Sequence, residues 1–124
     1  MLRMMKPTLK PGRFVFVGLD DQDIANIDAR ATVREAEGMS AVISQDDADS
    51  RGIEYDFVAV WITLRVESAL SAVGLTAAVS SCLCERGISC NVIAGLRHDH
   101  LLVPADRGSD AILALEALSA SAER

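Results

Sequence analysis

The chain has 124 residues and a formal net charge of −6, and half of its residues are hydrophobic although only 4% are aromatic. This composition excludes a disordered chain and predicts one folded unit, or two half-sized lobes that share a core of aliphatic side chains. Because no cluster of Lys or Arg offsets the acidic charge, we expect no nucleic-acid partner.

We expect neither a secretory signal nor a membrane partner. Residues 1–7 hold no apolar run long enough for a signal peptide, and the longest uncharged stretch, residues 68–84, is interrupted by Gly74. The three cysteines form no obvious disulfide framework. A cytoplasmic setting is therefore expected.

Short strands and turns alternate through the first half of the chain. Pro7 and Pro11 are expected to keep residues 1–12 as an arm without regular structure. No strong helix is expected between the first strand and residue 29. The elements expected after the arm are a strand at 13–18, a polar loop at 20–23, a hairpin of strands 32–36 and 39–43, and one or two helical turns at 45–51 that end at Gly52.

The second half carries the strongest strand and two amphipathic helices. The nearly continuous apolar run at 57–66 predicts a central strand that is covered on both faces. Apolar residues at helical spacing begin at Leu75, and Gly87 is placed to end that helix. The elements expected beyond it are a strand at 88–94, an antiparallel strand at 99–103, and a helix that is capped by Asp106 or Ser109 and buries Ala111, Ile112, Leu115 and Leu118.

This order of elements predicts an α+β fold with two ferredoxin-like βαββαβ lobes, antiparallel sheets and helices on one face. Strand 57–66 is expected to close the first lobe and open the second. The expected parts are an arm at 1–12, an N-terminal lobe at 13–66 whose first helix is replaced by a loop, and a C-terminal lobe at 57–122. The second lobe has no final strand of its own. We expect residues 14–17 or a partner subunit to fill that edge, because an open apolar edge would aggregate.

Four motifs carry a resemblance to a known family. They are TVREAEG at 32–38, AVGLTAA at 72–78, GISCNV at 87–92 and HDHL at 98–101. Residues 64–103 resemble the ACT domain, the small-molecule-sensing module found in the regulatory repeats of aspartate kinases. The whole chain from Arg13 resembles a small family of uncharacterised bacterial ACT-containing proteins. The resemblance implies a regulatory role, and no kinase chemistry, because the catalytic domain of aspartate kinase is absent.

The segment around Gly74 is the candidate ligand site. A helix that begins there leaves the backbone N–H groups of Leu75 and Thr76 to bind a carboxylate. The resemblance implies that this loop meets an asparagine of the next strand across a subunit interface, and Thr76 and Asn91 match those positions. The alternative is that Gly74 only starts a helix and Asn91 only bonds local backbone. The candidate ligand-binding residues are Val73, Gly74, Leu75, Thr76, Asn91, Ile93, His98 and His100.

The segment His98-Asp99-His100 supports a competing hypothesis. On a strand the two histidines would project to one side, where they would be able to chelate a metal, while Asp99 would point away. Because no third ligand is identified, hydrogen bonding or a pocket role is the favoured interpretation. Cys82 is expected to be a buried apolar residue, and none of the cysteines lies in a recognisable nucleophile pattern.

The sequence therefore predicts a non-enzymatic, homo-oligomeric regulatory module that binds a small molecule, such as a free amino acid, without a cofactor. Two alternatives stay open. One is a metal-binding protein or enzyme centred on residues 98–100, and the other is a pure protein-interaction module.

Overall fold

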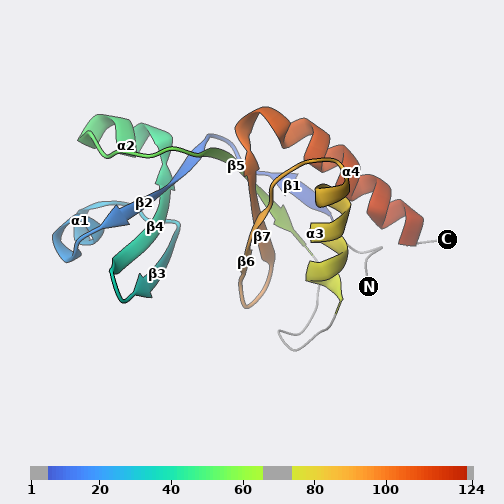
Figure 1. The fold of residues 1–124 in the computed structure, drawn as a ribbon, viewed down its shortest axis with the longest axis horizontal. Helices are drawn as coiled ribbons and strands as arrows, with labels where there is room; N and C mark the ends of the chain where they lie inside the picture. The colour runs from blue at the N-terminus through green and yellow to red at the C-terminus, as the bar shows by residue number, and fades with distance from the viewer. Residues whose placement is uncertain (1–5, 66–73, 123–124) are drawn as a thin grey trace. The chain divides into compact units, whose positions relative to one another are not determined.

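The structure is a computed structural model that describes residues 6–65 and 74–122, and it divides into two compact units (Figure 1). The N-terminal unit comprises Gly12–Ala59, and the C-terminal unit comprises Met1–Pro11 together with Val60–Arg124. The C-terminal unit is therefore discontinuous in sequence, because the N-terminal unit lies between its two segments.

Three strands and two short helices build the N-terminal unit. The elements are β2 (Phe14–Leu19), α1 (Asp21–Asn26), β3 (Ala31–Glu35), β4 (Gly38–Ser44) and α2 (Gln45–Arg51). Strand β4 pairs antiparallel with both β2 and β3, and the start of β5 (Val58–Leu64) pairs antiparallel with the start of β2. The first strand, the hairpin and the short helix ended by Gly52 are confirmed.

One face of this small sheet forms the core of the N-terminal unit. Alternate residues of β2 and β4 share that face because side chains along a strand point to opposite sides in turn. Ala48 of α2 packs into the same cluster. The buried residues of the cluster are Val15, Val17, Leu19, Ile27, Ala41, Ile43 and Ala48.

Helix α1 lies where the sequence predicted a polar loop without a helix. The carboxylate of Asp20 accepts a hydrogen bond from the backbone N–H of Asp23 at 2.8 Å, which caps the helix. Asp21 and Asp23 occupy the first turn, where the helix dipole favours negative charge. The acidic run is thus a helix start, and the prediction of a first lobe without its first helix is wrong.

In its described residues, the C-terminal unit has four strands, the two longer helices and a 3-10 turn. They are β1 (Pro7–Leu9), β5, α3 (Leu75–Glu85), β6 (Asn91–Ala94), β7 (Asp99–Pro104), the 3-10 turn η2 (Ala105–Arg107) and α4 (Gly108–Ala122). The strand order in this unit is β1-β5-β7-β6. The pairs β1–β5 and β6–β7 are antiparallel.

Both long helices of this unit pack on one face of its strands. Val60, Ile62 and Leu64 of β5 point into that core, and Trp61 and Thr63 therefore lie on the opposite face. Five of the seven residues of β5 are buried, which confirms its predicted central position. The buried core residues are Val60, Ile62, Leu64, Leu75, Val79, Cys82, Leu83, Ile88, Leu101, Val103, Ala111, Ala114 and Leu115.

Strand β1 corrects two predictions about the N-terminal segment. Residues 1–12 were expected to lack regular structure, but Pro7–Leu9 forms a strand, since proline is tolerated as the first residue of an edge strand. Its register pairs Thr8 with Thr63 and Leu9 with Ile62. The edge of β5 at residues 62–64 is thus filled by β1, and not by a partner subunit or by residues 14–17. Phe14 and Val15 pair with β5 only at Ala59 and Val58.

The predicted helix ends are correct for α3 and wrong for α4. Gly87 is left-handed (φ 69°), and the backbone N–H of Ile88 donates to the carbonyl of Leu83 at 3.0 Å, as in a glycine-ended helix. Helix α4 begins at Gly108, so Ser109 lies within the helix and does not cap it. Ala111 and Leu115 are fully buried, as their spacing predicted.

Candidate functional site

The first part of the candidate site is the start of α3. Gly74 precedes the helix with a φ of 105° and has no side chain that could cap it. A ligand carboxylate at the helix start would therefore not compete with a capping side chain of this residue. Leu75 is buried, whereas Thr76 is exposed. Val73 lies outside the described residues. The helix start thus brings exposed Thr76 beside Leu64 and Val92 of the sheet.

A narrow hollow lies between this helix start and the sheet. It measures about 180 Å³ and leaves no room for a water molecule. Thr76 and Asp99 are the polar residues that line it. The remaining lining residues are Leu64, Leu75, Val79, Val92 and Leu101. In this conformation the hollow is apolar packing with a polar rim, so a ligand here would have to bind at the rim.

The second part of the candidate site lies on the other face of the sheet. Asn91 pairs with Leu102, and Ile93 pairs with His100, so these residues share the face opposite Val92. Asn91 is exposed, and Ile93 and His100 are half-buried. Asn91 is therefore outside the helix-packed core, and Thr76 and Asn91 are not brought together on one face of one chain.

His100 is the centre of a hydrogen-bonded cluster on this second face. The indole Nε1–H of Trp61 donates to Nδ1 of His100 and to Oγ1 of Thr63, each at 3.2 Å. Oγ1 of Thr63 lies 3.1 Å from the same Nδ1. The rings of Trp61 and His100 are 5.3 Å apart between centroids. Because an indole N–H only donates, Nδ1 of His100 must accept, which places the ring proton on Nε2.

The surroundings of His100 disfavour its protonated form. Burial lowers its pKa from the ordinary value of 6.5, and the neighbouring His98 lowers it further. Asp99 raises the pKa and Lys10 lowers it. The ammonium group of Lys10 lies 5.1 Å from the centroid of the Trp61 ring, so that ring has a cation beside it as well as the imidazole.

The competing hypothesis of a metal chelate assumed that both histidines project from one strand. His98 precedes β7, is exposed, and does not lie on the strand with His100, while Nδ1 of His100 already accepts from Trp61. Within residues 6–65 and 74–122, no three His, Cys, Asp or Glu side chains are grouped to hold a metal ion. The prediction that both histidines project from one strand is therefore wrong. His98 belongs to the turn that begins at Gly95, and β7 begins only at Asp99.

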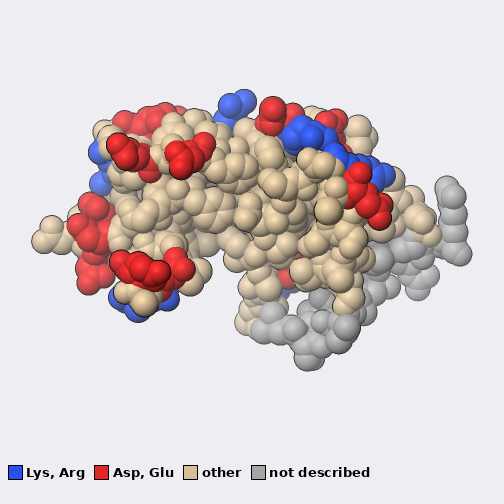
Figure 2. Space-filling view, viewed as in Figure 1, with Lys and Arg blue, Asp and Glu red and all other residues tan. Residues whose placement is uncertain are grey.

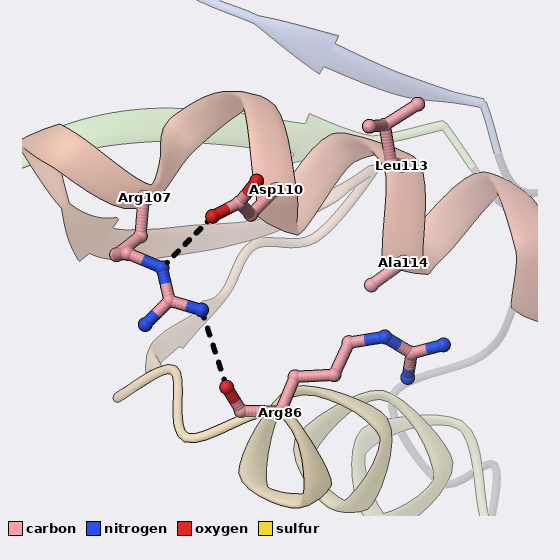
Figure 3. Close-up of a pocket in the computed structure, with 5 residues that line it drawn as sticks. All are labelled: Arg86, Arg107, Asp110, Leu113 and Ala114. Carbon is pink, nitrogen blue, oxygen red and sulfur yellow. Dashed lines mark hydrogen bonds and ion pairs between the residues drawn. The ribbon is translucent and has the colours of Figure 1, made fainter.

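A larger groove separates the end of α3 from the start of α4 (Figure 3). It measures about 460 Å³ and is lined by Arg86, Arg107, Asp110, Leu113 and Ala114. Arg107 donates to the Asp110 carboxylate at 3.0 Å and to the backbone carbonyl of Arg86 at 3.2 Å, and Arg86 donates to the carbonyl of Cys82 at 3.2 Å. Both guanidinium groups thus satisfy carbonyls at the negative end of α3, which is a structural role.

The acidic charge is unevenly distributed along the chain. Residues 12–59 contain 11 acidic and 4 basic side chains, a net charge of −7, whereas the remainder contains 7 acidic and 8 basic ones, a net charge of +1. Acidic side chains stand on the surface of α1 and α2 in the N-terminal unit (Figure 2). The candidate ligand residues therefore belong to the nearly neutral part of the chain.

The three cysteines differ in burial. Cys82 is buried in the core as predicted, Cys84 is exposed, and Cys90 is half-buried. Burial raises the pKa of the Cys90 thiol above its ordinary value of 9.0. Among the described residues, no helix is long and apolar enough to cross a membrane.

Sequence reasoning missed Trp61 and Thr63 as partners of His100. The signal was present in the strand itself, since these two residues alternate with Val60, Ile62 and Leu64 and so had to share the face away from the helices. What the sequence did not reveal is which strand lies beside β5. The order β5-β7-β6 brings His100 against that face.

Comparisons with known proteins cover almost the whole chain. One family model described as an ACT domain matches residues 1–60, and a second model with the same description matches residues 57–117. No curated protein matches the chain. A Vibrio cholerae protein of unknown function, described as a possible transport protein, is 39% identical over 95% of this chain and 92% of its own, with a TM-score of 0.87.

More distant structures share the fold at low identity. The ligand-free regulatory subunit of aspartate kinase from Thermus thermophilus is 11% identical over 93% of this chain and 98% of its own, with a TM-score of 0.65. The Agobacterium tumefaciens protein Atu0741 is 18% identical over 93% of this chain and 89% of its own, with a TM-score of 0.66. The predicted fold, two ACT-type domains in tandem with α+β content, is confirmed.

Proposed function

This chain belongs to the ACT-domain family, and from that premise we propose that it is a non-enzymatic regulatory module that binds a small molecule, specifically a free amino acid. The observation that carries the proposal is the tandem match of two ACT-type models over residues 1–117. The likeness to the regulatory subunit of aspartate kinase supports the same assignment at the level of the fold.

The arrangement of the candidate residues supports a site that is shared between two copies of the chain. Thr76 and the start of α3 lie on the helix-covered face, and Asn91 lies on the opposite face of β6. One ligand therefore reaches both sets only if each set comes from a different subunit. We propose a homodimer in which the α3 start of one chain binds the ligand carboxylate and Asn91 of the other chain bonds its polar groups.

A thermal-shift screen against the twenty amino acids tests this function. A ligand present at about 100 times its dissociation constant stabilises the folded chain by about 2.7 kcal/mol, which gives a clear rise in melting temperature. The expected result is a rise for one amino acid or a few chemically related ones. A screen in which none of the twenty raises the melting temperature contradicts the proposal and favours the protein-interaction alternative.

Asn91 provides the sharper test once a ligand is found. Asn91→Ala removes an exposed side chain, so we expect little change in fold stability but a loss of about 1–3 kcal/mol in binding free energy, measured by calorimetry. Asn26→Ala, the same substitution on the surface of the N-terminal unit, is the matched control and should leave binding unchanged. Unaltered affinity in Asn91→Ala would remove Asn91 from the site.

The oligomeric state is tested separately. Light scattering at micromolar concentration is expected to give the mass of a dimer or a larger assembly. A monomer that still binds an amino acid would retain the ligand-binding function but contradict the shared site.

A further inference from the structure

We propose that Trp61, Thr63 and His100 form a proton-sensitive latch for strand β1, which loosens from β5 when Nδ1 of His100 gains a proton. The proposal rests on the hydrogen bonds and packing around Trp61 in the C-terminal unit, and it is independent of the proposed ligand-binding function.

Trp61 contacts both Lys10, which follows β1, and His100 on β7. Its backbone carbonyl accepts a hydrogen bond from the backbone N–H of Lys10 at 2.8 Å, and the Lys10 ammonium lies 5.1 Å from the centroid of its ring. Its indole N–H donates to Nδ1 of His100 on β7. The Trp61 ring is therefore held by His100 on one side, and on the other side it lies beside Lys10 at the end of β1.

A proton on Nδ1 is incompatible with this arrangement. The indole N–H has no lone pair to offer, so an Nδ1–H group would face another donor at 3.2 Å. Of the two groups now bonded to Nδ1, only the Thr63 hydroxyl is able to accept the new proton, and it lies at 3.1 Å. Protonation therefore breaks the Trp61–His100 bond and makes Nδ1 the donor in the Thr63–His100 bond, so the indole keeps its bond to Thr63 but loses its partner on β7.

Two of the three charged or titratable groups near His100 also disfavour its protonated form. The neighbouring Lys10 and His98 are basic, and Asp99 on the same strand is the acidic group that opposes them. The partner of His100 across β6 is the apolar Ile93. An imidazolium at this position would also repel the Lys10 ammonium that follows β1, because both groups lie beside the same Trp61 ring.

Strand β1 is the element that borders the changed contact. It has three residues, it pairs with residues 62–64 of β5 and packs against α4, and Leu9 stays 45% exposed, so it is a short element next to the Trp61 ring. The folded state resists protonation of His100, since burial lowers its pKa from 6.5. The unfolded or opened state therefore binds more protons below about pH 6.5, and acid favours release of β1.

Hydrogen exchange of the Lys10 amide tests the latch. We expect its protection factor to fall between pH 7.5 and pH 5.0, by at most about tenfold for each pH unit below 6.5. The Arg30 amide, which donates to the Val42 carbonyl in the N-terminal unit, serves as the internal reference. The chain has one tryptophan, so its indole N–H resonance should shift over the same pH range.

Two matched variants decide the outcome. His100→Gln keeps a hydrogen-bond acceptor for Trp61 but does not titrate, so its Lys10 protection should stay constant with pH. His98→Gln removes the neighbouring exposed histidine and should retain the fall. An equal fall in His100→Gln, or no fall in the unmodified chain, overturns the proposal.

The test does not depend on the folding of His100→Gln. The imidazole resonances of His100 in the unmodified chain give its titration midpoint in the folded state, and the fall in Lys10 protection should level off near that pH. A fall that continues well below this midpoint also overturns the proposal.

Discussion

The two units match the same family of domains, yet they are built on different scales. The helices of the N-terminal unit have 6 and 7 residues, whereas those of the C-terminal unit have 11 and 15. The described core clusters hold 7 and 13 buried residues respectively. An isolated helix shorter than about 12 residues is marginal in water, so α1, α2 and α3 all need support from the rest of the chain. Helix α1 is capped by Asp20 and buries no residue, whereas α3 buries four residues and has no side-chain cap.

The comparison indicates that the C-terminal unit supplies most of the stability and the candidate ligand residues. The N-terminal unit carries the excess acidic charge, with a net charge of −7 against +1 for the remainder. Self-repulsion among those carboxylates opposes its compact state. We therefore expect the N-terminal unit to open before the C-terminal unit, and the following predictions test this difference.

Loss of core volume should cost most in the larger core. Leu83 and Ile43 are both fully buried, one in each unit. We expect Leu83→Ala to lower the free energy of unfolding by about 3–5 kcal/mol and Ile43→Ala by about 2–3 kcal/mol, measured by urea denaturation. A larger loss from Ile43→Ala would reverse the proposed ranking of the two units.

Close packing at the start of α4 should make a small added group costly. A Cβ at Gly108 would lie 2.9 Å from Cγ2 of Val60, although the backbone angles of Gly108 are ordinary for a helix. Gly108→Ala should therefore destabilise the chain by about 1–3 kcal/mol. Val60→Ala in the same chain should relieve part of this loss, which a double-mutant cycle measures.

The matched control for Gly108 lies in the N-terminal unit. A Cβ at Gly18 on β2 would meet no atom within 4 Å. Gly18→Ala should be neutral or stabilising by about 0.5 kcal/mol, since glycine is unfavourable in a strand. A similar loss for both variants would show that the contact with Val60 is not the cause.

Helix caps should matter in the N-terminal unit. The Ser44 hydroxyl accepts from the Asp47 N–H at 3.1 Å at the start of α2, and Asp20 does the same for α1. Ser44→Ala and Asp20→Ala should each cost about 1 kcal/mol. Native-state hydrogen exchange should locate the loss in α1 and α2, and an equal loss of protection in α3 would contradict a local effect.

Thiol labelling reports on the C-terminal unit alone, because all three cysteines lie there. Burial raises the pKa of the Cys90 thiol above its ordinary value, so less of that thiol is ionised at a given pH than of an exposed cysteine. Iodoacetamide should therefore modify exposed Cys84 first, Cys90 more slowly and with a rate that still rises above pH 9, and buried Cys82 last. Mass spectrometry of the peptides gives the order, and early labelling of Cys82 would show that this unit opens readily.

Periodicity was sufficient to predict the elements with long apolar repeats. The alternation in β5 and the helical spacing from Leu75 describe packing against a large core, and the structure has both elements at the predicted positions. Helix α1 and strand β1 could not be found in this way. The first is capped by Asp20 and has no fully buried residue, and the second has three residues paired with a segment far away in sequence.

The candidate site was harder to predict than the fold for a related reason. Motif matches placed Thr76 and Asn91 correctly on a helix start and a strand, and strand alternation predicted that Asn91 faces away from the helix-packed core. These patterns did not show that Thr76 and Asn91 lie on opposite faces in one chain. The contact of His100 with Trp61 depends on the order of strands in the sheet, which the sequence leaves open. Site geometry that depends on neighbouring strands thus required the structure.

The discontinuous C-terminal unit has a consequence for the order of folding. Closing a flexible loop of about 50 residues between Leu9 and Ile62 costs about 3.5 kcal/mol in chain entropy. Within the intervening unit, however, Phe14 pairs with Ala59, so folding of that unit already brings its two ends together. The weaker unit would then act as the nucleus that lets β1 reach β5, and slowing its formation during synthesis would delay completion of the stronger one.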